Sequence, residues 1–168
     1  YVMPTNQNII MVANQAAEII AGEGQQTVVV LETRSVPEGL SAMLNFDEGA
    51  SPEDNKAAMT EAFGQVHTLS VTRAVKDATI DGLEIKAGAY MGLCDRKIGY
   101  TGRSSRAIIL KMLAKFPEAS FVTVLYGADV AEETANKLVD AMKEQLPDAE
   151  FSLIWGGQPL YDYVISVE

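Results

Sequence analysis

The spacing of apolar residues changes several times along the chain, and each spacing predicts a different kind of element. From Asn8 onward apolar side chains recur every three or four residues, which predicts an amphipathic helix. TVVVLE, residues 27–32, is a short continuous apolar run, typical of a strand buried on both faces. Helical spacing returns after TRSVPEG and again after Ser51. The first third of the chain therefore predicts a β-α-β-α arrangement that opens on Val2–Met3.

The pattern changes to alternation at HTLSVTRAV, residues 67–75, which is the period of a half-buried strand. Three turn signals follow, namely Asp81-Gly82, Ala87-Gly88 and Asp95-Arg96. Short apolar segments between such turns indicate antiparallel hairpins. We expect an antiparallel meander at about residues 67–101.

Helix and strand patterns alternate again in the last third. A helix is expected at 104–116, a buried strand at 121–127 and a further helix before Pro147, and the strands FSLIW and YVISV flank GGQPLYD. Such β-α-β order favours a parallel sheet. We therefore predict an α/β fold with a mainly parallel sheet flanked by helices and the meander inserted in the middle. The 168 residues suit one domain of that kind.

Charge limits the partners that this chain can bind. The 13 basic and 23 acidic residues give a formal net charge of −10. Nucleic acids and anionic membrane surfaces both require a cationic footprint, so neither is expected as the main partner. Hydrophobic content of 48% and charged content of 21% are those of a globular protein.

Cysteine use and apolar run lengths indicate the compartment. Cys94 is the single cysteine, which excludes an intrachain disulfide and a cysteine-based metal cluster. No apolar run approaches the roughly 20 residues that cross a bilayer, and no leader pattern is present. We expect a cytoplasmic protein without direct membrane insertion. Because Tyr1 stands in place of an initiator Met and Val2–Met3 resembles a strand end, we also expect a piece of a longer chain.

PTNQN, residues 4–8, lies where the first strand hands over to the first helix. Asn6 and Asn8 have neutral amides that can cap a helix, an effect worth about 1 kcal/mol. The same place in an open α/β sheet also collects ligands. We expect these residues primarily to start the helix and secondarily to line a crevice.

TRSVPEG is the second strand-to-helix junction at the same end of the predicted sheet. Thr33 and Ser35 offer hydroxyls, Arg34 offers a fork for a carboxylate or phosphate, and Gly39 permits a close approach. Ser35 followed by Glu38 also fits a capping box, which needs no ligand. Both interpretations remain open for this segment.

GGQPLYD supplies a third junction. Gly156 and Gly157 permit backbone conformations that a side chain would prevent, and Gln158 could point into the same crevice as Asn6. A tight connection before the last strand is the alternative. Asn6, Asn8, Thr33, Arg34, Ser35, Gly39, Gly156, Gly157 and Gln158 are together the candidate ligand- or partner-binding residues.

Recognisable catalytic machinery is missing from the chain. His67 is the single histidine, and we interpret it as an ordinary strand residue rather than a base or a phosphoryl acceptor. The sequence contains no phosphate loop, no dinucleotide-binding glycine motif and no nucleophile elbow. We therefore expect no catalytic residue and no metal site in this domain.

Several segments resemble one protein family in order along the whole chain. They are PTNQN, TRSVPEG, NKAAMTEA, VTRAVKD, GLEIKAGAYMG, VLYG and the terminal GGQPLYDYVISVE. Together they are similar to the C-terminal, DegV-like domain of the dihydroxyacetone-kinase-like ATP-binding subunit of bacterial fatty acid kinase. The terminal segment is the most specific of them.

This resemblance implies a division of labour within a longer protein. ATP and Mg²⁺ are expected on an aspartate cluster in a separate N-terminal domain, so no cofactor is expected here. The kinase phosphorylates a fatty acid held by a DegV-like partner, and the resemblance allows a homodimer of the parent protein. By this interpretation the present domain docks or positions the fatty-acid-binding partner.

Three functions remain in competition. The first is the non-catalytic partner-binding domain. The second is a domain that itself binds a fatty acid in a crevice of Asn6, Thr33, Ser35 and Gln158. The third is an enzyme or substrate domain of glycerone-kinase type, or a phosphoryl acceptor that uses His67.

Overall fold

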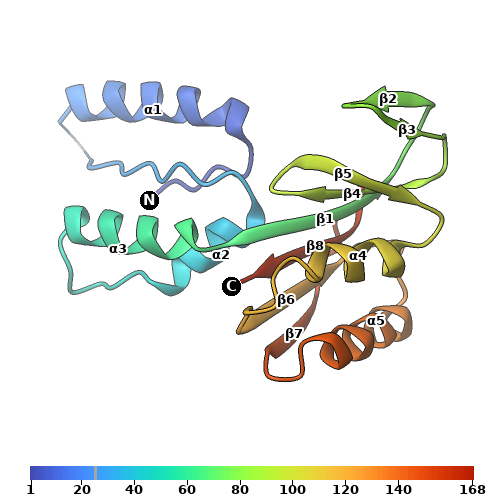
Figure 1. Cartoon of the computed structure of the whole chain (residues 1–168). Helices are drawn as coiled ribbons and strands as arrows, with labels where there is room; N and C mark the ends of the chain where they lie inside the picture. Colours follow the sequence, from blue (N-terminus) through green and yellow to red (C-terminus); the bar gives the residue numbers. More distant parts are fainter. Residues whose placement is uncertain (25) are drawn as a thin grey trace. The chain divides into compact units, whose positions relative to one another are not determined.

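A computed structural model describes residues 1–24 and 26–168. The chain divides into two compact units, residues 1–66 and 67–168, which are described separately below (Figure 1). The prediction of one domain over 1–168 stays a prediction.

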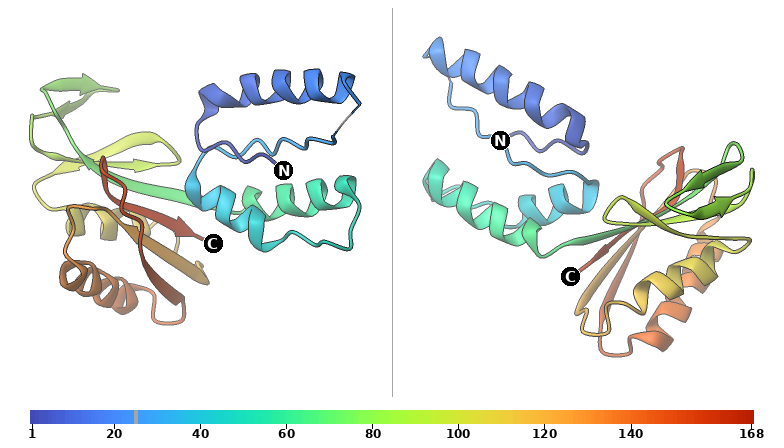
Figure 2. Two further views of the ribbon diagram at one scale, coloured as in Figure 1. Left: turned by 180° about the vertical axis from the view of Figure 1, so that it is seen from behind. Right: turned by 45° about the horizontal axis from the view of Figure 1, so that its top comes forward.

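Among its described residues, the first unit has three helices around a pair of extended segments. The helices are α1 (Gln7–Gly22), α2 (Val36–Leu44) and α3 (Pro52–Gly64). The extended segments lie between α1 on one side and α2 with α3 on the other, as both views of Figure 2 show. Leu31, Ala42 and Met59 form the buried centre of this unit. All three helices begin at a polar residue, Asn6, Ser35 or Ser51, whose side chain accepts a backbone N–H of the first turn.

The predicted strand at 27–32 is reduced to a single β-bridge. Val2 and Val30 pair in parallel, and the residues around them are extended without a further ladder. The parallel direction agrees with the predicted β-α-β order, because α1 connects the two segments.

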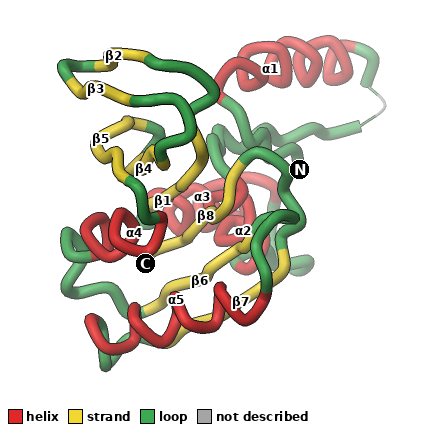
Figure 3. Tube along the Cα trace, turned by 90° about the vertical axis from the view of Figure 1, so that its right-hand side faces the viewer, coloured by secondary structure: helices red, strands yellow, loops and turns green. Residues whose placement is uncertain are grey.

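The second unit is built on a six-stranded sheet with the order β5-β4-β1-β8-β6-β7. Its strands are β1 (His67–Arg73), β4 (Tyr90–Cys94), β5 (Lys97–Gly102), β6 (Phe121–Tyr126), β7 (Glu150–Trp155) and β8 (Tyr161–Val167). The helices α4 (Ser105–Leu113) and α5 (Glu132–Gln145) share one buried core with it. Leu69, Ile109, Val124, Met142 and Ile165 lie at the centre of that core. Figure 3 shows the two helices beside the strands.

The α/β class and the flanking helices are confirmed, whereas the prediction of a mainly parallel sheet is wrong. β6 and β7 pair in parallel across α5, but β5–β4, β4–β1, β1–β8 and β8–β6 are antiparallel. The β4–β5 hairpin pairs with β1 in the first half of the sheet, and the return of the chain after β7 makes the two pairs of β8 antiparallel. The segment 156–160 reverses its direction, so β8 enters between β1 and β6 instead of extending the β6–β7 edge.

The predicted meander contains the expected turns in a different arrangement. β2 (Ala78–Ile80) and β3 (Leu83–Ile85) form a separate two-stranded hairpin, while β4 and β5 join the main sheet. Asp81, Gly82, Gly88, Asp95 and Arg96 all have positive φ, as tight turns require.

None of the helices in the described residues is both long and apolar enough to cross a membrane.

Candidate functional site

The two predicted strand-to-helix junctions of the first unit lie together. Parallel pairing of Val2 with Val30 carries residues 4–6 and 33–35 to the same end of the paired segments. Thr33 is fully buried there, and its hydroxyl donates a 2.7 Å hydrogen bond to the Pro4 carbonyl oxygen. This bond joins the two junctions directly.

Asn6 and Asn8 have different positions at the start of α1. The Asn6 side-chain oxygen accepts the Asn8 backbone N–H at 2.9 Å, so Asn6 is the N-cap. Both side chains are exposed. The prediction that PTNQN primarily starts a helix is therefore confirmed, and its role in lining a crevice stays a prediction.

Ser35 caps α2, and the Glu38 side chain reaches back to the backbone before the helix. The Ser35 hydroxyl accepts the Glu38 N–H at 3.2 Å, while the Glu38 carboxylate accepts the Arg34 N–H at 2.5 Å. Gly39 is buried, and a side chain there would come within 3.9 Å of the Met3 Cβ atom. Thr33, Ser35 and Gly39 of this segment are buried, whereas the Arg34 side chain is exposed.

Gly156, Gly157 and Gln158 lie in the second unit and form a tight return after β7. The Gly156 N–H donates to the Tyr126 carbonyl at 2.9 Å, and Gly157 has a φ of +66°. The Gln158 amide folds back and donates to the Leu125 carbonyl at 3.0 Å. A side chain on Gly156 would overlap the Gln158 Oε1 atom. These contacts give the segment a structural role, and a crevice shared by Gln158 and Asn6 stays a prediction.

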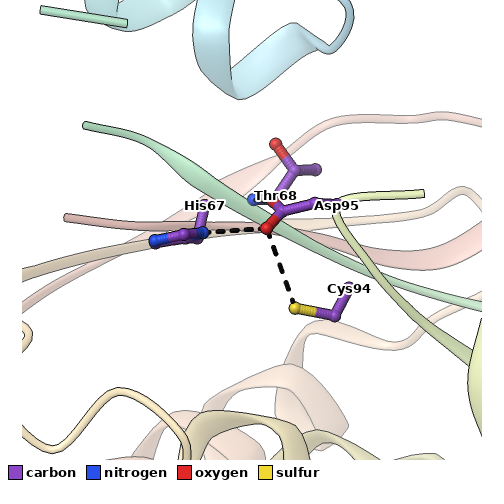
Figure 4. A network of polar contacts seen from close by, with 4 residues as sticks. All are labelled: His67, Thr68, Cys94 and Asp95. Atoms are coloured by element: carbon purple, nitrogen blue, oxygen red, sulfur yellow. Dashed lines mark hydrogen bonds and ion pairs between the residues drawn. The ribbon is translucent and has the colours of Figure 1, made fainter. Parts of the chain in front are cut away.

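His67 has a partner that the sequence did not reveal (Figure 4). Its Nδ1 atom lies 2.8 Å from Asp95 Oδ2, and the other carboxylate oxygen accepts the Thr68 N–H at 2.9 Å. The Phe116 ring lies 4.6 Å from the imidazole, centroid to centroid. A carboxylate beside Nδ1 favours the proton on that nitrogen and directs Nε2 away from it. The imidazole is therefore oriented, with about half of its side chain exposed.

Cys94 lies next to this pair without being activated by it. Its Sγ atom is 4.0 Å from Asp95 Oδ2. Burial raises the pKa of the Cys94 thiol, and the negative charge of Asp95 raises it further. A raised thiol pKa reduces the thiolate fraction at neutral pH, which is the opposite of what a nucleophilic cysteine needs.

A second polar cluster joins β1, β4 and β8. The Arg73 guanidinium donates to the Tyr90 hydroxyl, and its Nε atom lies 4.0 Å from Asp162 Oδ2. Burial raises the pKa of Asp162, Arg73 opposes that rise, and Asp129 adds to it. Burial also raises the pKa of Tyr163 to about 12. Sequence patterns did not predict this cluster, since its members come from separate strands.

Metal ligation finds no support in the described part of the chain. No group of three or more His, Cys, Asp or Glu side chains there is placed to hold a metal ion. The geometry therefore contains helix caps, a buried hydroxyl link and an oriented imidazole. These features hold parts of the surface in fixed positions. Among the described residues, they do not pair a nucleophile with a base.

Comparison with a family model gives the decisive observation. The model of the FakA-like C-terminal family, which represents the C-terminal part of FakA-like fatty acid kinase proteins, matches residues 1–168. The chain belongs to this family. A Staphylococcus aureus USA300 protein of uncharacterised function is 37% identical to this FakA-like C-terminal chain over 169 residues. A protein of strain N315 gives the same figures.

Those relatives are considerably longer than this FakA-like C-terminal chain. The aligned region covers 99% of the chain and 30% of each relative. The chain thus spans about 30% of the length of the curated relatives that it matches.

Solved structures of a fatty acid kinase B protein and of DegV family proteins have the same fold as the FakA-like C-terminal chain. The Streptococcus pneumoniae fatty acid kinase (Fak) B3 protein loaded with linoleic acid matches with a TM-score of 0.65 and 15% identity, over 99% of this chain and 70% of that one. A DegV family protein from Eubacterium eligens loaded with heptadecanoic acid matches with a TM-score of 0.69 and 13% identity, over 99% and 71%. The predicted DegV-like fold is therefore confirmed.

Proposed function

We propose that this chain is a non-catalytic docking domain of a fatty acid kinase and binds the DegV-like protein that holds the fatty acid. The observation that carries the proposal is the match of the whole chain to the FakA-like C-terminal family, together with its DegV-like fold. A kinase needs a surface that recognises the protein carrying its substrate. This domain supplies that surface, and the acyl chain stays in the partner.

Local contacts of the candidate residues support a shaped surface. Thr33 bonds Pro4, Ser35 caps α2, and Gln158 bonds Leu125. Their polar groups are used to hold the backbone in position. They therefore make rigid corners for a partner to recognise.

The outer face of α2 offers the apolar part of such a surface. Val36, Leu40, Met43 and Leu44 follow helical spacing and are 46%, 39%, 57% and 86% exposed. Exposed apolar stripes of this kind are typical of protein interfaces. Arg34 lies two residues before this stripe and adds a cation that can pair with a carboxylate. We define Arg34, Val36, Leu40, Met43 and Leu44 as the α2 face and assign the DegV-like partner to it.

The chemical step belongs to other parts of the parent protein in this proposal. ATP and Mg²⁺ are assigned to a separate part of the fatty acid kinase, and the family match is what supports this assignment. Phosphoryl transfer from ATP to an acyl carboxylate places the complex in the cytoplasm, where ATP is available. A homodimer of the parent protein is compatible with this arrangement.

Calorimetric titration of the chain with its cognate DegV-like protein tests the proposal. We expect saturable binding, weakened about tenfold or more by Leu44→Ser or Arg34→Ala, as for residues central to an interface. Lys143→Ala, which removes an exposed cation from α5, is the matched control and should bind like the unaltered chain. Absence of binding at high micromolar concentration contradicts the docking role, and equal weakening by all three variants contradicts the α2 face.

Fatty acid binding by the chain itself is the second candidate function. It is favoured by the fold of the fatty-acid-loaded neighbours. Within the first unit, the residues assigned to this alternative are Asn6, Thr33 and Ser35. Native mass spectrometry of the purified chain after incubation with linoleic acid would show a retained acyl chain, and an unliganded mass alone contradicts this alternative.

A further inference from the structure

The paired extended segments of the first unit have an open edge at Met3. The Val2 N–H donates to the Val29 carbonyl at 2.8 Å, and the Val2 carbonyl accepts the Leu31 N–H at 2.9 Å. Both polar groups of Val2 therefore point toward residues 29–31. Met3 precedes a proline, which restricts it to extended backbone, so its N–H and carbonyl point to the opposite edge.

No backbone hydrogen bond of the described residues uses either polar group of Met3. Unpaired groups along an extended segment form a template for another strand. Two paired strands alone are only marginally stable in water, so this pair would be stabilised by a further strand. Sheets of parallel strands normally continue across several strands covered by helices on both faces.

Side-chain exposure distinguishes the two edges of this pair. Val2 is 41% exposed, whereas its partner Val30 is 6% exposed. Tyr1 and Phe46 are 42% and 43% exposed and make an edge-to-face contact at 5.2 Å. The uncovered apolar surface thus lies on the side of the first segment, where the Met3 groups are unpaired.

We propose that this edge receives a β-strand from the part of the parent polypeptide that lies outside residues 1–168. The relatives have about 70% of their length outside the region that matches this chain. The structural neighbours likewise have nearly a third of their chain without a counterpart in these residues. The parent protein therefore has enough additional polypeptide to complete the sheet, and this inference does not depend on the docking role.

One exposed apolar side of α1 can pack against the crossover segment that leads to such a strand. Parallel strands are joined by crossovers that usually contain a helix packed on the sheet. Ile9, Val12 and Ile19 lie along one side of α1 and are 51%, 57% and 66% exposed. Glu18 is the single charged residue of this helix. A strand from the same polypeptide also has the advantage of a high effective concentration over one from a separate molecule.

Amide hydrogen exchange at single-residue resolution tests the assignment in the full-length parent protein. The Leu31 N–H, which donates to Val2, is the internal control for fraying of the pair. We expect the Met3 N–H to exchange on the order of 100-fold more slowly than an unprotected amide and about as slowly as Leu31. This protection should be the same at all protein concentrations, and Met3 should exchange rapidly in the 168-residue chain.

The remaining outcomes overturn the proposal. Rapid exchange of Met3 in the full-length protein, with Leu31 protected, shows an edge that stays open. Protection of Met3 that rises with protein concentration assigns the edge to a second copy. Protection that requires addition of the DegV-like protein assigns it to that partner.

Discussion

Gly92 in β4 controls how closely α4 approaches the sheet, and Gly92→Ala is our most quantitative prediction. A Cβ atom at this position would overlap the Ile108 Cγ2 atom and lie 3.0 Å from Met112 Sδ and 3.2 Å from Tyr100 Cβ. Ordinary van der Waals contact begins at 3.4 Å. Ile108 is 4% exposed and Met112 is fully buried, so neither side chain can move into solvent.

The expected cost follows from two opposing effects. Overpacking a buried site costs about 1–3 kcal/mol. Replacing a glycine inside a strand returns about 0.5–1 kcal/mol of backbone entropy. Because the new Cβ atom would overlap the Ile108 Cγ2 atom outright, we expect the upper part of the overpacking range, about 2–3 kcal/mol, and so a net loss of about 1–2.5 kcal/mol in the free energy of unfolding. For a unit of about 100 residues, the size of the unit His67–Glu168 that contains Gly92, each kcal/mol lowers Tm by about 4–8 °C.

Urea unfolding followed by circular dichroism measures this loss, and Gly99→Ala is the matched control. Gly99 lies in the neighbouring strand β5, where a new Cβ atom meets nothing within 4 Å. That variant should be unchanged or slightly more stable. Gly92→Ala at wild-type stability, or an equal loss in Gly99→Ala, would refute the close-packing argument.

A further test combines Gly92→Ala with Ile108→Ala. The single change at Ile108 should cost about 2–5 kcal/mol, as truncation of a buried isoleucine does. The double variant should be less destabilised than the sum of the two, because the overlapping atom has been removed. Additive losses would show that the overlap is not the cause.

Three more predictions concern single contacts. Ser35→Ala should lower the free energy of unfolding by about 0.5–2 kcal/mol through loss of the α2 cap, measured by urea unfolding, whereas Ser35→Asn should retain most of it. Burial raises the pKa of Tyr163 to about 12. The folded state therefore keeps a proton that the unfolded state loses near pH 10. The free energy of unfolding should fall by up to about 2.7 kcal/mol between pH 10 and 12. Tyr163→Phe should remove that part of the alkaline loss, and an unchanged pH profile would contradict it. A hydrogen bond from the Ala87 N–H, together with the nearby Lys86, lowers the pKa of Asp77. The ionised Asp77 should therefore stabilise the β2–β3 hairpin above pH 3.8, the ordinary pKa of this carboxyl group. This contribution should be lost as the pH falls through the lower pKa of the folded state. Amide exchange of Ala87 across this range, with Asp77→Asn as the comparison, measures the effect.

Local signals in the sequence predicted helix starts well and strand partners poorly. Ser35 and Ser51 mark helices that begin where expected, because a cap and its first turn lie within four residues. The Asp95-Arg96 turn was also predicted, since positive φ is a property of the turn itself. The direction of β8 could not be predicted in this way, because a β-α-β pattern does not show which strand the following one will join.

In the candidate site, too, local contacts were predicted and contacts between distant residues were missed. Asn6 and Ser35 were identified together with their alternative role as caps, and the structure uses both as caps. Asp95 was missed as the partner of His67, because the two are 28 residues apart and meet only once β1 pairs with β4. The Thr33 bond to Pro4 was missed for the same reason.

The place of β8 at the middle of its sheet has a consequence for synthesis. β8 comes last of the six strands along the chain, yet it lies between β1 and β6. While a ribosome is still making it, the β1–β4–β5 part and the β6–β7 part have no common partner strand. A product truncated before Tyr161 would leave both halves with unpaired edges, which proteases and chaperones recognise. Synthesis as far as β8 is thus a condition for a complete sheet in the second unit, and chains that stop before β8 should be removed before they can occupy a binding partner.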